Sequence, residues 1–140
     1  MPRLLRVGFL LLVVSALPAC ESTRPTILGP TPVDQGIVIY IHSEFAGSSQ
    51  AIAVDIRDLD DVEGPCAKGD SESVRLSWDD CMSSIQVRPG WAVRLYSDPD
   101  FKGASTEVVA DATNLSTLSG PCKKGGYNDC VSSLKVYKRE

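Results

Sequence analysis

The sequence predicts an all-β fold made of two copies of one motif, with two four-stranded sheets packed face to face. Three observations support this prediction. The chain contains an internal repeat, each copy contains short segments of alternating apolar and polar residues, and no segment shows the sustained apolar stripe of an amphipathic helix. A chain of 140 residues has room for one such domain and a short additional segment.

The internal repeat is the strongest of these observations. The two copies align at an offset of 56 residues up to the first cysteine of each copy and at 49 beyond it, because the first copy carries seven extra residues between its cysteines. Agreement over so many positions with a single change of length indicates duplication of a motif of about fifty residues. The aligned pairs are 40–47 (YIHSEFAG) with 96–103 (YSDPDFKG), 64–66 (GPC) with 120–122 (GPC), and 78–85 (WDDCMSSI) with 127–134 (YNDCVSSL).

Each copy contains the same strand-forming segments, rich in β-branched and aromatic residues. The predicted strands are 37–41, 51–56, 85–87, 92–96, 106–109 and 134–136. Comparison of the copies separates an inner from an outer face, as expected for a half-buried strand with a period of two. The inner positions are Ile37, Ile39, Val93 and Leu95, and the outer positions are Val38 and Arg94.

Residues 1–19 have the features of a bacterial export signal. Arg3 and Arg6 flank the start of an apolar run that ends at Leu17 and is too short to span a bilayer, which needs about 20 residues. The end of the run, LPAC at 17–20, resembles the lipobox of bacterial lipoproteins. This resemblance implies that Cys20 is acylated, for example with palmitate, and becomes the first residue of a membrane-anchored protein facing outside the cytoplasm. An ordinary signal peptide is the alternative.

The next segment, 20–36, is rich in proline, glycine and threonine and predicts a tether. A first edge strand at 26–28 is the alternative. The domain is then expected to span 37–140, with the first motif at about 37–88 and the second at about 91–138.

Composition and motifs argue against two classes of function. The net charge of −4 disfavours a nucleic-acid partner, which usually selects a basic face. The sequence contains no phosphate-cradling loop, zinc-type cysteine spacing or nucleophile elbow. Its single histidine, His42, lies within the first aromatic segment, where a surface or turn position is expected. We therefore predict no catalytic residues and a protein that is not an enzyme.

Two motifs in each copy resemble those of the βγ-crystallin family. One motif consists of an aromatic residue, four further residues, a second aromatic residue, one more residue and a glycine. It resembles the folded-hairpin signature of that family, in which the two rings cover a bend of the chain and the glycine avoids backbone strain. The other, at 79–84 and 128–133, has two Asn or Asp, two variable residues, then Ser-Ser, and resembles the calcium motif of that family. The resemblance covers about 36–138 and implies a double Greek-key β-sandwich.

The resemblance also implies two Ca²⁺ sites, each between the acidic loop of one copy and the folded hairpin of the other. Ca²⁺ prefers six to eight oxygen ligands. Because each site would have few charged ligands, the expected affinity is modest, with a dissociation constant of about 10⁻⁵ to 10⁻³ M. The second serines, Ser84 and Ser133, are expected to hydrogen-bond within the turn. Alternatively, the acidic pairs serve only as turn residues. The implied ligands are Asp79 or Asp80, the Cys81 carbonyl, Ser83 and the Pro99 carbonyl in one site, and Asn128 or Asp129, the Cys130 carbonyl, Ser132 and the Ser43 carbonyl in the other.

The five cysteines are consistent with export. An odd number in an oxidising compartment leaves one thiol to explain, and acylation of Cys20 accounts for it. The other four allow three disulfide pairings. The symmetry between the copies favours Cys66–Cys81 and Cys122–Cys130, one disulfide in each motif.

Three functional classes remain. The first is a calcium-binding module with a structural or stress-related role at the cell envelope, monomeric and attached to a membrane by its lipid. The second is an inhibitor of an extracellular protease, which would use the exposed loop 67–76. The third is an adhesion or sugar-binding domain that recognises a surface ligand through exposed aromatic residues such as Trp91.

Overall fold

The computed structural model describes residues 34–69, 74–123 and 125–140. The predicted export signal, Cys20 and the alternative edge strand at 26–28 lie outside the described residues. Within the described ranges, no helix is long and apolar enough to span a membrane.

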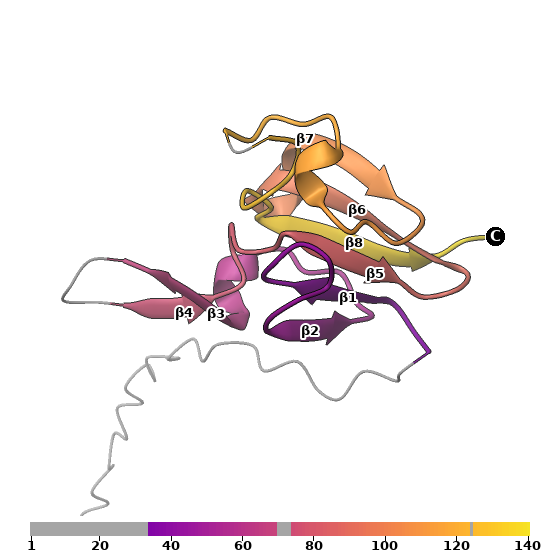
Figure 1. Cartoon of the computed structure of the whole chain (residues 1–140), viewed down its shortest axis with the longest axis horizontal. Coiled ribbons are helices and arrows are strands. Elements are labelled where there is room, and N and C mark those ends of the chain that lie inside the picture. Colours follow the sequence, from indigo (N-terminus) through magenta and orange to yellow (C-terminus); the bar gives the residue numbers. More distant parts are fainter. Residues whose placement is uncertain (1–33, 70–73, 124) are drawn as a thin grey trace, which may run out of the picture.

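The described chain is all-β, as predicted, and consists of two three-stranded antiparallel sheets and a separate two-stranded hairpin (Figure 1). The strand order is β2-β1-β5 in the first sheet and β7-β6-β8 in the second, and β3 pairs with β4 in the hairpin. Three short 3₁₀ helices, η1 to η3, lie between strands. The elements are β1 (Ile37–Tyr40), β2 (Ser49–Ile52), η1 (Leu59–Asp61), β3 (Glu63–Lys68), β4 (Arg75–Ser77), β5 (Ser84–Val87), β6 (Trp91–Asp98), η2 (Pro99–Phe101), β7 (Lys102–Val108), η3 (Leu115–Thr117) and β8 (Ser133–Lys138).

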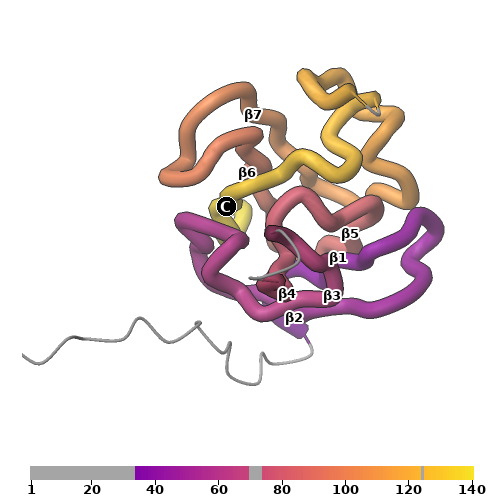
Figure 2. The backbone as a smooth tube through the Cα atoms, turned by 90° about the vertical axis from the view of Figure 1, so that its left-hand side faces the viewer, coloured from indigo at the N-terminus to yellow at the C-terminus, as the bar shows by residue number. Residues whose placement is uncertain are grey.

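Each sheet is completed by a segment from the other copy. Ile56 of the first copy bridges to Leu134 on β8, and Ala112 of the second copy bridges to Ile85 on β5. The four backbone hydrogen bonds of these bridges are 2.8–3.0 Å long. The fourth strand that the sequence predicts for each sheet is therefore present only as a single bridging residue, and the two copies lie against each other along this line (Figure 2).

Two aspartates add side-chain hydrogen bonds to the backbone bridges between the copies. The carboxylate of Asp55 accepts a 2.9 Å hydrogen bond from the backbone N–H of Val136 on β8. Its repeat equivalent, Asp111, accepts a 2.8 Å hydrogen bond from Val87 on β5. Each copy thus supplies both a backbone bridge and a side-chain acceptor to the last strand of the other copy.

The core lies between the two sheets. The four predicted inner residues of β1 and β6 are all 0% exposed, which confirms the alternation on that face. The prediction for Val38 was wrong in one respect, since this outer residue is only 8% exposed. Val38 has a short side chain and lies between Ala51 and Gln86 on the strands at either side. Arg94, the equivalent residue in the second copy, is exposed.

The folded hairpins follow β1 and β6. The ring centroids of Tyr40 and Phe45 lie 5.6 Å apart, and those of the equivalent Tyr96 and Phe101 lie 5.7 Å apart. Gly47 has a φ of +81°, and a Cβ there would lie 2.5 Å from a side-chain carbon of Ile41. The structure therefore confirms the packed aromatic pair and the need for glycine after it.

The strands β3 and β4 were not predicted. The sequence indicated a loop at 67–76, whereas the structure pairs Ala67 with Leu76 and Lys68 with Arg75 in a hairpin that projects from the body (Figure 1). The signal was weak because β3 contains Gly-Pro, which is typical of breaks in a strand, and has no clear alternation. The described residues at the two sides of the extra segment thus pair with each other in a hairpin.

Candidate calcium-binding loops

The two acidic loops lie side by side at the boundary between the copies. The backbone N–H of Asp80 donates to the carbonyl of Val131, and that of Asp129 donates to the carbonyl of Met82, both over 3.1 Å. Asp80 and Asp129 have φ values of 50° and 51°, in the left-handed region that aspartate tolerates better than most residues. The second acid of each motif therefore occupies a strained turn that also joins the copies.

A buried aromatic residue and a disulfide position each loop. Trp78 and Tyr127, directly before the acidic pairs, are 2% and 1% exposed. The disulfides are Cys66–Cys81 and Cys122–Cys130, with Cα atoms 5.9 and 5.8 Å apart, as the symmetry of the repeat predicts. Each loop is thus fixed on one side by a core ring and on the other by a covalent bond.

The second serine of each motif holds the folded hairpin of its own copy. The hydroxyl of Ser84 donates to the carbonyl of His42 over 2.5 Å and accepts from the backbone N–H of Phe45 over 3.1 Å. Ser133 makes the equivalent contacts with Asp98 and Phe101. Both serines are buried, and the structure gives them the turn-stabilising role that the sequence predicts.

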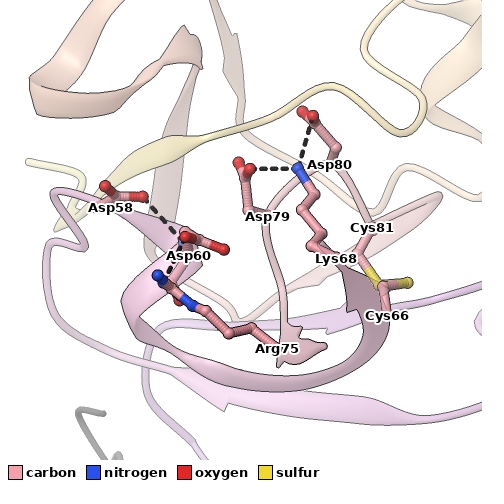
Figure 3. A network of polar contacts seen from close by, with 8 residues as sticks. All are labelled: Asp58, Asp60, Cys66, Lys68, Arg75, Asp79, Asp80 and Cys81. Carbon is pink, nitrogen blue, oxygen red and sulfur yellow. Dashed lines mark hydrogen bonds and ion pairs between the residues drawn. A yellow bond between two sulfur atoms is a disulfide. The ribbon is translucent and has the colours of Figure 1, made fainter. Parts of the chain in front are cut away.

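Beside the first acidic loop lies a pocket of about 390 Å³, which we call the first pocket. It brings Asp79 of the first copy to Pro99 in the folded hairpin of the second copy. Basic groups already contact its acids: Lys68 pairs with Asp79 and, over 2.9 Å, with Asp80, and Arg75 pairs with Asp60 (Figure 3). The lining residues are Asp58, Asp60, Lys68, Gly69, Arg75, Asp79 and Pro99.

The charges of the first pocket influence one another. Burial lowers the pKa of Lys68, but its hydrogen bonds and ion pairs with Asp79 and Asp80 outweigh burial and raise the pKa overall. Burial raises the pKa of Asp58, and the nearby carboxylates add to this effect, although a hydrogen bond from the backbone N–H of Asp60 opposes it. The Oδ1 atom of Asp79 is buried and has no hydrogen-bond partner among the described residues. The pocket therefore favours positive charge and retains an unsatisfied oxygen.

The second acidic loop has an equivalent pocket of about 500 Å³, the second pocket. Asn128 and Ser43 here occupy the repeat positions of Asp79 and Pro99 in the first pocket. The hydroxyl of Ser83 lies 3.3 Å from Asp129 Oδ1, and Asn128 Nδ2 donates to the other carboxylate oxygen of Asp129 over 3.1 Å. The lining residues are His42, Ser43, Ser83, Asn114, Ser116 and Asn128.

The sequence analysis assigned Ser83 to the first site, together with Asp79 or Asp80 and Pro99. The structure places Ser83 in the second pocket with Ser43 and Asn128. The reason is topological: the backbone N–H of Ser83 donates to the carbonyl of Tyr40 over 2.9 Å, which brings the serine to the folded hairpin of its own copy. Asp79 of the same loop instead lines the first pocket with Pro99, in the hairpin of the other copy.

The remaining predicted ligands fall into two groups. Asp79 and Pro99 meet in the first pocket, and Ser43 and Asn128 meet in the second. Among the described residues that line the two pockets, the other predicted ligands do not occur: Asp80, Cys81, Asp129, Cys130 and Ser132.

The oxygen atoms of the second pocket fit a hard cation. Among the described residues there is no group of three or more His, Cys, Asp or Glu side chains arranged to hold a metal ion. A metal in the second pocket would therefore depend on hydroxyl, amide and carbonyl oxygens with the nearby Asp129, a set that suits Ca²⁺ better than softer metals. The acids of the first pocket have suitable chemistry, but basic side chains already pair with them.

Several residues of this region were missed from the sequence. Asp58, Asp60, Lys68 and Arg75 line the first pocket although none belongs to the two motifs. A signal was available in the repeat for part of this set, because Asp58 and Asp60 align with the neutral Asn114 and Ser116, whereas Lys68, two residues after Cys66, aligns with Lys124, two residues after Cys122.

Comparisons with known proteins agree with this architecture. No family model matches the chain. The chain is 29% identical over 100 residues to the development-specific protein S homolog of Myxococcus xanthus, an alignment that covers 71% of this chain and 46% of that protein. The chain thus spans less than half the length of that relative.

Solved structures show the fold. A βγ-crystallin domain from Flavobacterium johnsoniae is 27% identical, with a TM-score of 0.52 over 73% of this chain and 93% of that chain. A structure from work on the evolution of the eye-lens βγ-crystallin domain fold has 23% identity and a TM-score of 0.59, covering 81% of this chain and 95% of that chain. The described part of this chain is therefore a βγ-crystallin-type domain with two Greek-key motifs.

Proposed function

We propose that this protein is an exported, lipid-anchored βγ-crystallin-type module that binds Ca²⁺ at the cell envelope and has a structural rather than an enzymatic role. The observation that carries the calcium proposal is the second pocket, where Ser43, Ser83 and Asn128 gather oxygen atoms from both copies beside Asp129. Because these groups converge only in the folded domain, bound Ca²⁺ should stabilise the fold.

Calorimetric titration of the purified protein with CaCl₂ tests this proposal. Ser83→Ala removes one neutral oxygen and is expected to weaken binding about fivefold to tenfold, whereas Asn128→Asp adds a carboxylate and should strengthen it. The matched control is Ser105→Ala, which removes an exposed hydroxyl on β7. An absence of heat and of any change in melting temperature at millimolar Ca²⁺ would refute calcium binding and leave the acidic pairs as turn residues.

Anchoring rests on the LPAC sequence that ends at Cys20. We expect the mature protein to carry lipid on Cys20 and to fractionate with membranes. Cys20→Ser removes the thiol that receives the lipid, so it should abolish acylation and leave precursor or a soluble product. Intact mass spectrometry distinguishes these states, and an unmodified Cys20 thiol in the wild-type protein would contradict the proposal.

One observation favours a second candidate, binding of an extracellular protease. The β3–β4 hairpin projects from the body and exposes Val74 and Leu76, at 60% and 55% of their surface. Stoichiometric inhibition of such a protease, lost in Leu76→Asp, would favour this role. The adhesion hypothesis has less support, because Trp91 is partly buried against the core and Lys138 lies 5.8 Å from the centre of its ring.

A further inference from the structure

The second sheet, β7-β6-β8 in Figure 1, carries a pocket of about 500 Å³, which we call the outer pocket. Each lining residue is flanked along its strand by a buried residue, so the pocket lies on the face of the sheet that points away from the core. Its volume is in the usual range for a small-molecule site. Among the described residues, its lining includes neither Trp91 nor any residue of the two acidic motifs. The lining residues are Arg94, Tyr96, Glu107, Lys135 and Tyr137.

Three charged residues form a row across this face. Arg94 on β6 lies directly opposite Glu107 on β7 and, on its other side, directly opposite Lys135 on β8. The Glu107 carboxylate pairs with Arg94 over 3.5 Å and also accepts a hydrogen bond from the hydroxyl of Tyr137. The row therefore contains two cations and one carboxylate. Its two like charges are neighbours on adjacent strands, an arrangement that destabilises a sheet.

Lys135 is the cation of this row that has no acidic partner. Its ammonium group lies 4.6 Å from the centre of the Phe101 ring, and it forms no ion pair with any of the described residues. Arg57 lies 6.0 Å from the centre of the same ring, but Asp100 pairs with it over 2.6 Å. A ring face attracts a cation without neutralising it. An anion bound beside Lys135 would therefore relieve the repulsion within the row.

The repeat shows that the fold does not require these charges. The first copy forms a sheet with the same strand order, yet it has uncharged residues at four of the five equivalent positions. The exception is Arg88, which stands where the second copy has Tyr137. The charged row is thus a property of the outer pocket and not of the common motif. In the order Arg94, Tyr96, Glu107, Lys135 and Tyr137, the first copy has Val38, Tyr40, Ala51, Gln86 and Arg88.

We propose that the outer pocket binds an acidic sugar unit of an anionic polysaccharide. Lys135 and Arg94 hold the carboxylate of the sugar, and Glu107 accepts hydrogen bonds from its hydroxyl groups. The rings of Tyr96 and Tyr137 supply rigid contact area with a hydroxyl group at the tip. This role goes beyond the proposed calcium function, because it uses a different surface and needs no metal ion.

The chemistry of the pocket distinguishes among anionic ligands. A uronic acid has one carboxylate and several hydroxyl groups on the same ring, which suits two cations beside a hydrogen-bond acceptor. A phosphodiester, as in a nucleic acid or a lipid headgroup, brings negative charge without a hydroxyl donor of its own. Glu107 would therefore repel a phosphodiester and would gain no hydrogen bond from it.

Calorimetric titration of the purified protein with trigalacturonate, in EDTA to remove Ca²⁺, tests this inference. We expect one site per chain and no binding of maltotriose, an uncharged trisaccharide. Lys135→Gln installs the residue that the first copy has at this position, so the variant should fold. It is expected to weaken binding at least about tenfold, because a charged hydrogen bond is lost. The matched control is Lys138→Gln, which removes the same charge from β8 outside the pocket and should bind like the wild type.

A second variant guards against a folding defect in the first. Arg94→Val also installs the residue of the first copy and should weaken binding by a similar factor. Equal weakening by Lys135→Gln and Lys138→Gln would indicate attraction by net charge alone and overturn the inference. It is also overturned if the wild type gives no heat with trigalacturonate, and binding to phosphatidylglycerol vesicles would then identify a lipid surface instead. Because EDTA is present throughout, these results leave the proposed calcium function untouched.

Discussion

Replacing Trp78 or Tyr127 by alanine is expected to lower the free energy of unfolding by about 3–5 kcal/mol, the usual cost of removing a large aromatic ring from a core. The two side chains are 2% and 1% exposed and occupy equivalent positions directly before the acidic pairs. Because a domain of this size has about 5–15 kcal/mol of stability in total, either change removes a large part of it. Urea denaturation followed by circular dichroism measures the loss.

The repeat supplies matched controls for this prediction. Trp78→Tyr and Tyr127→Trp exchange the rings found at the same position in the two copies. Trp78→Tyr should cost less than Trp78→Ala because most of the buried volume is kept, whereas Tyr127→Trp adds volume to a filled site and should cost about 1–3 kcal/mol. Alanine variants that lose under about 1 kcal/mol would show that the rings do not fix the loops. In the Tyr127→Ala protein we also expect weaker Ca²⁺ binding, since Asn128 loses the buried residue that positions it.

Removal of either disulfide is expected to have the next largest effect. The cysteines are 15 residues apart in the first copy and 8 apart in the second. Loop-closure entropy then predicts losses of about 3 kcal/mol for Cys66→Ala with Cys81→Ala and about 2.5 kcal/mol for Cys122→Ala with Cys130→Ala.

Urea denaturation with and without a reducing agent tests the disulfide prediction. The reducing agent should destabilise the wild type and each double variant, but should leave a variant with all four cysteines replaced unchanged. Equal midpoints for the wild type and both double variants would contradict a stabilising role of the disulfides.

Much of the architecture could be predicted because each sequence pattern occurs in both copies and can be compared between them. The inner positions of β1 and β6, the packed aromatic pairs and the symmetric disulfides all follow from comparing one copy with the other. These features are local or are fixed by symmetry, so the order of residues along the chain determines them.

The features that were missed depend on how distant segments meet. The pocket that receives Ser83 is decided by its hydrogen bond to Tyr40, which spacing within the motif does not reveal. Burial of Val38 depends on the residues that the strand register places beside it, Ala51 and Gln86. Likewise, the pairing of Lys68 with Asp79 and Asp80 depends on the register of a hairpin whose first strand contains Gly-Pro.

The exchange of bridging residues between the copies has a kinetic consequence. Asp55 must reach Val136, 81 positions away, before the second sheet is complete, so the closing steps of folding join distant parts of the chain. Loop-closure entropy opposes such contacts, and domains dominated by them fold in milliseconds to seconds rather than microseconds. During that interval a chain that has formed only its first copy presents β5 as an unpaired edge, open to the equivalent segment of a neighbouring chain.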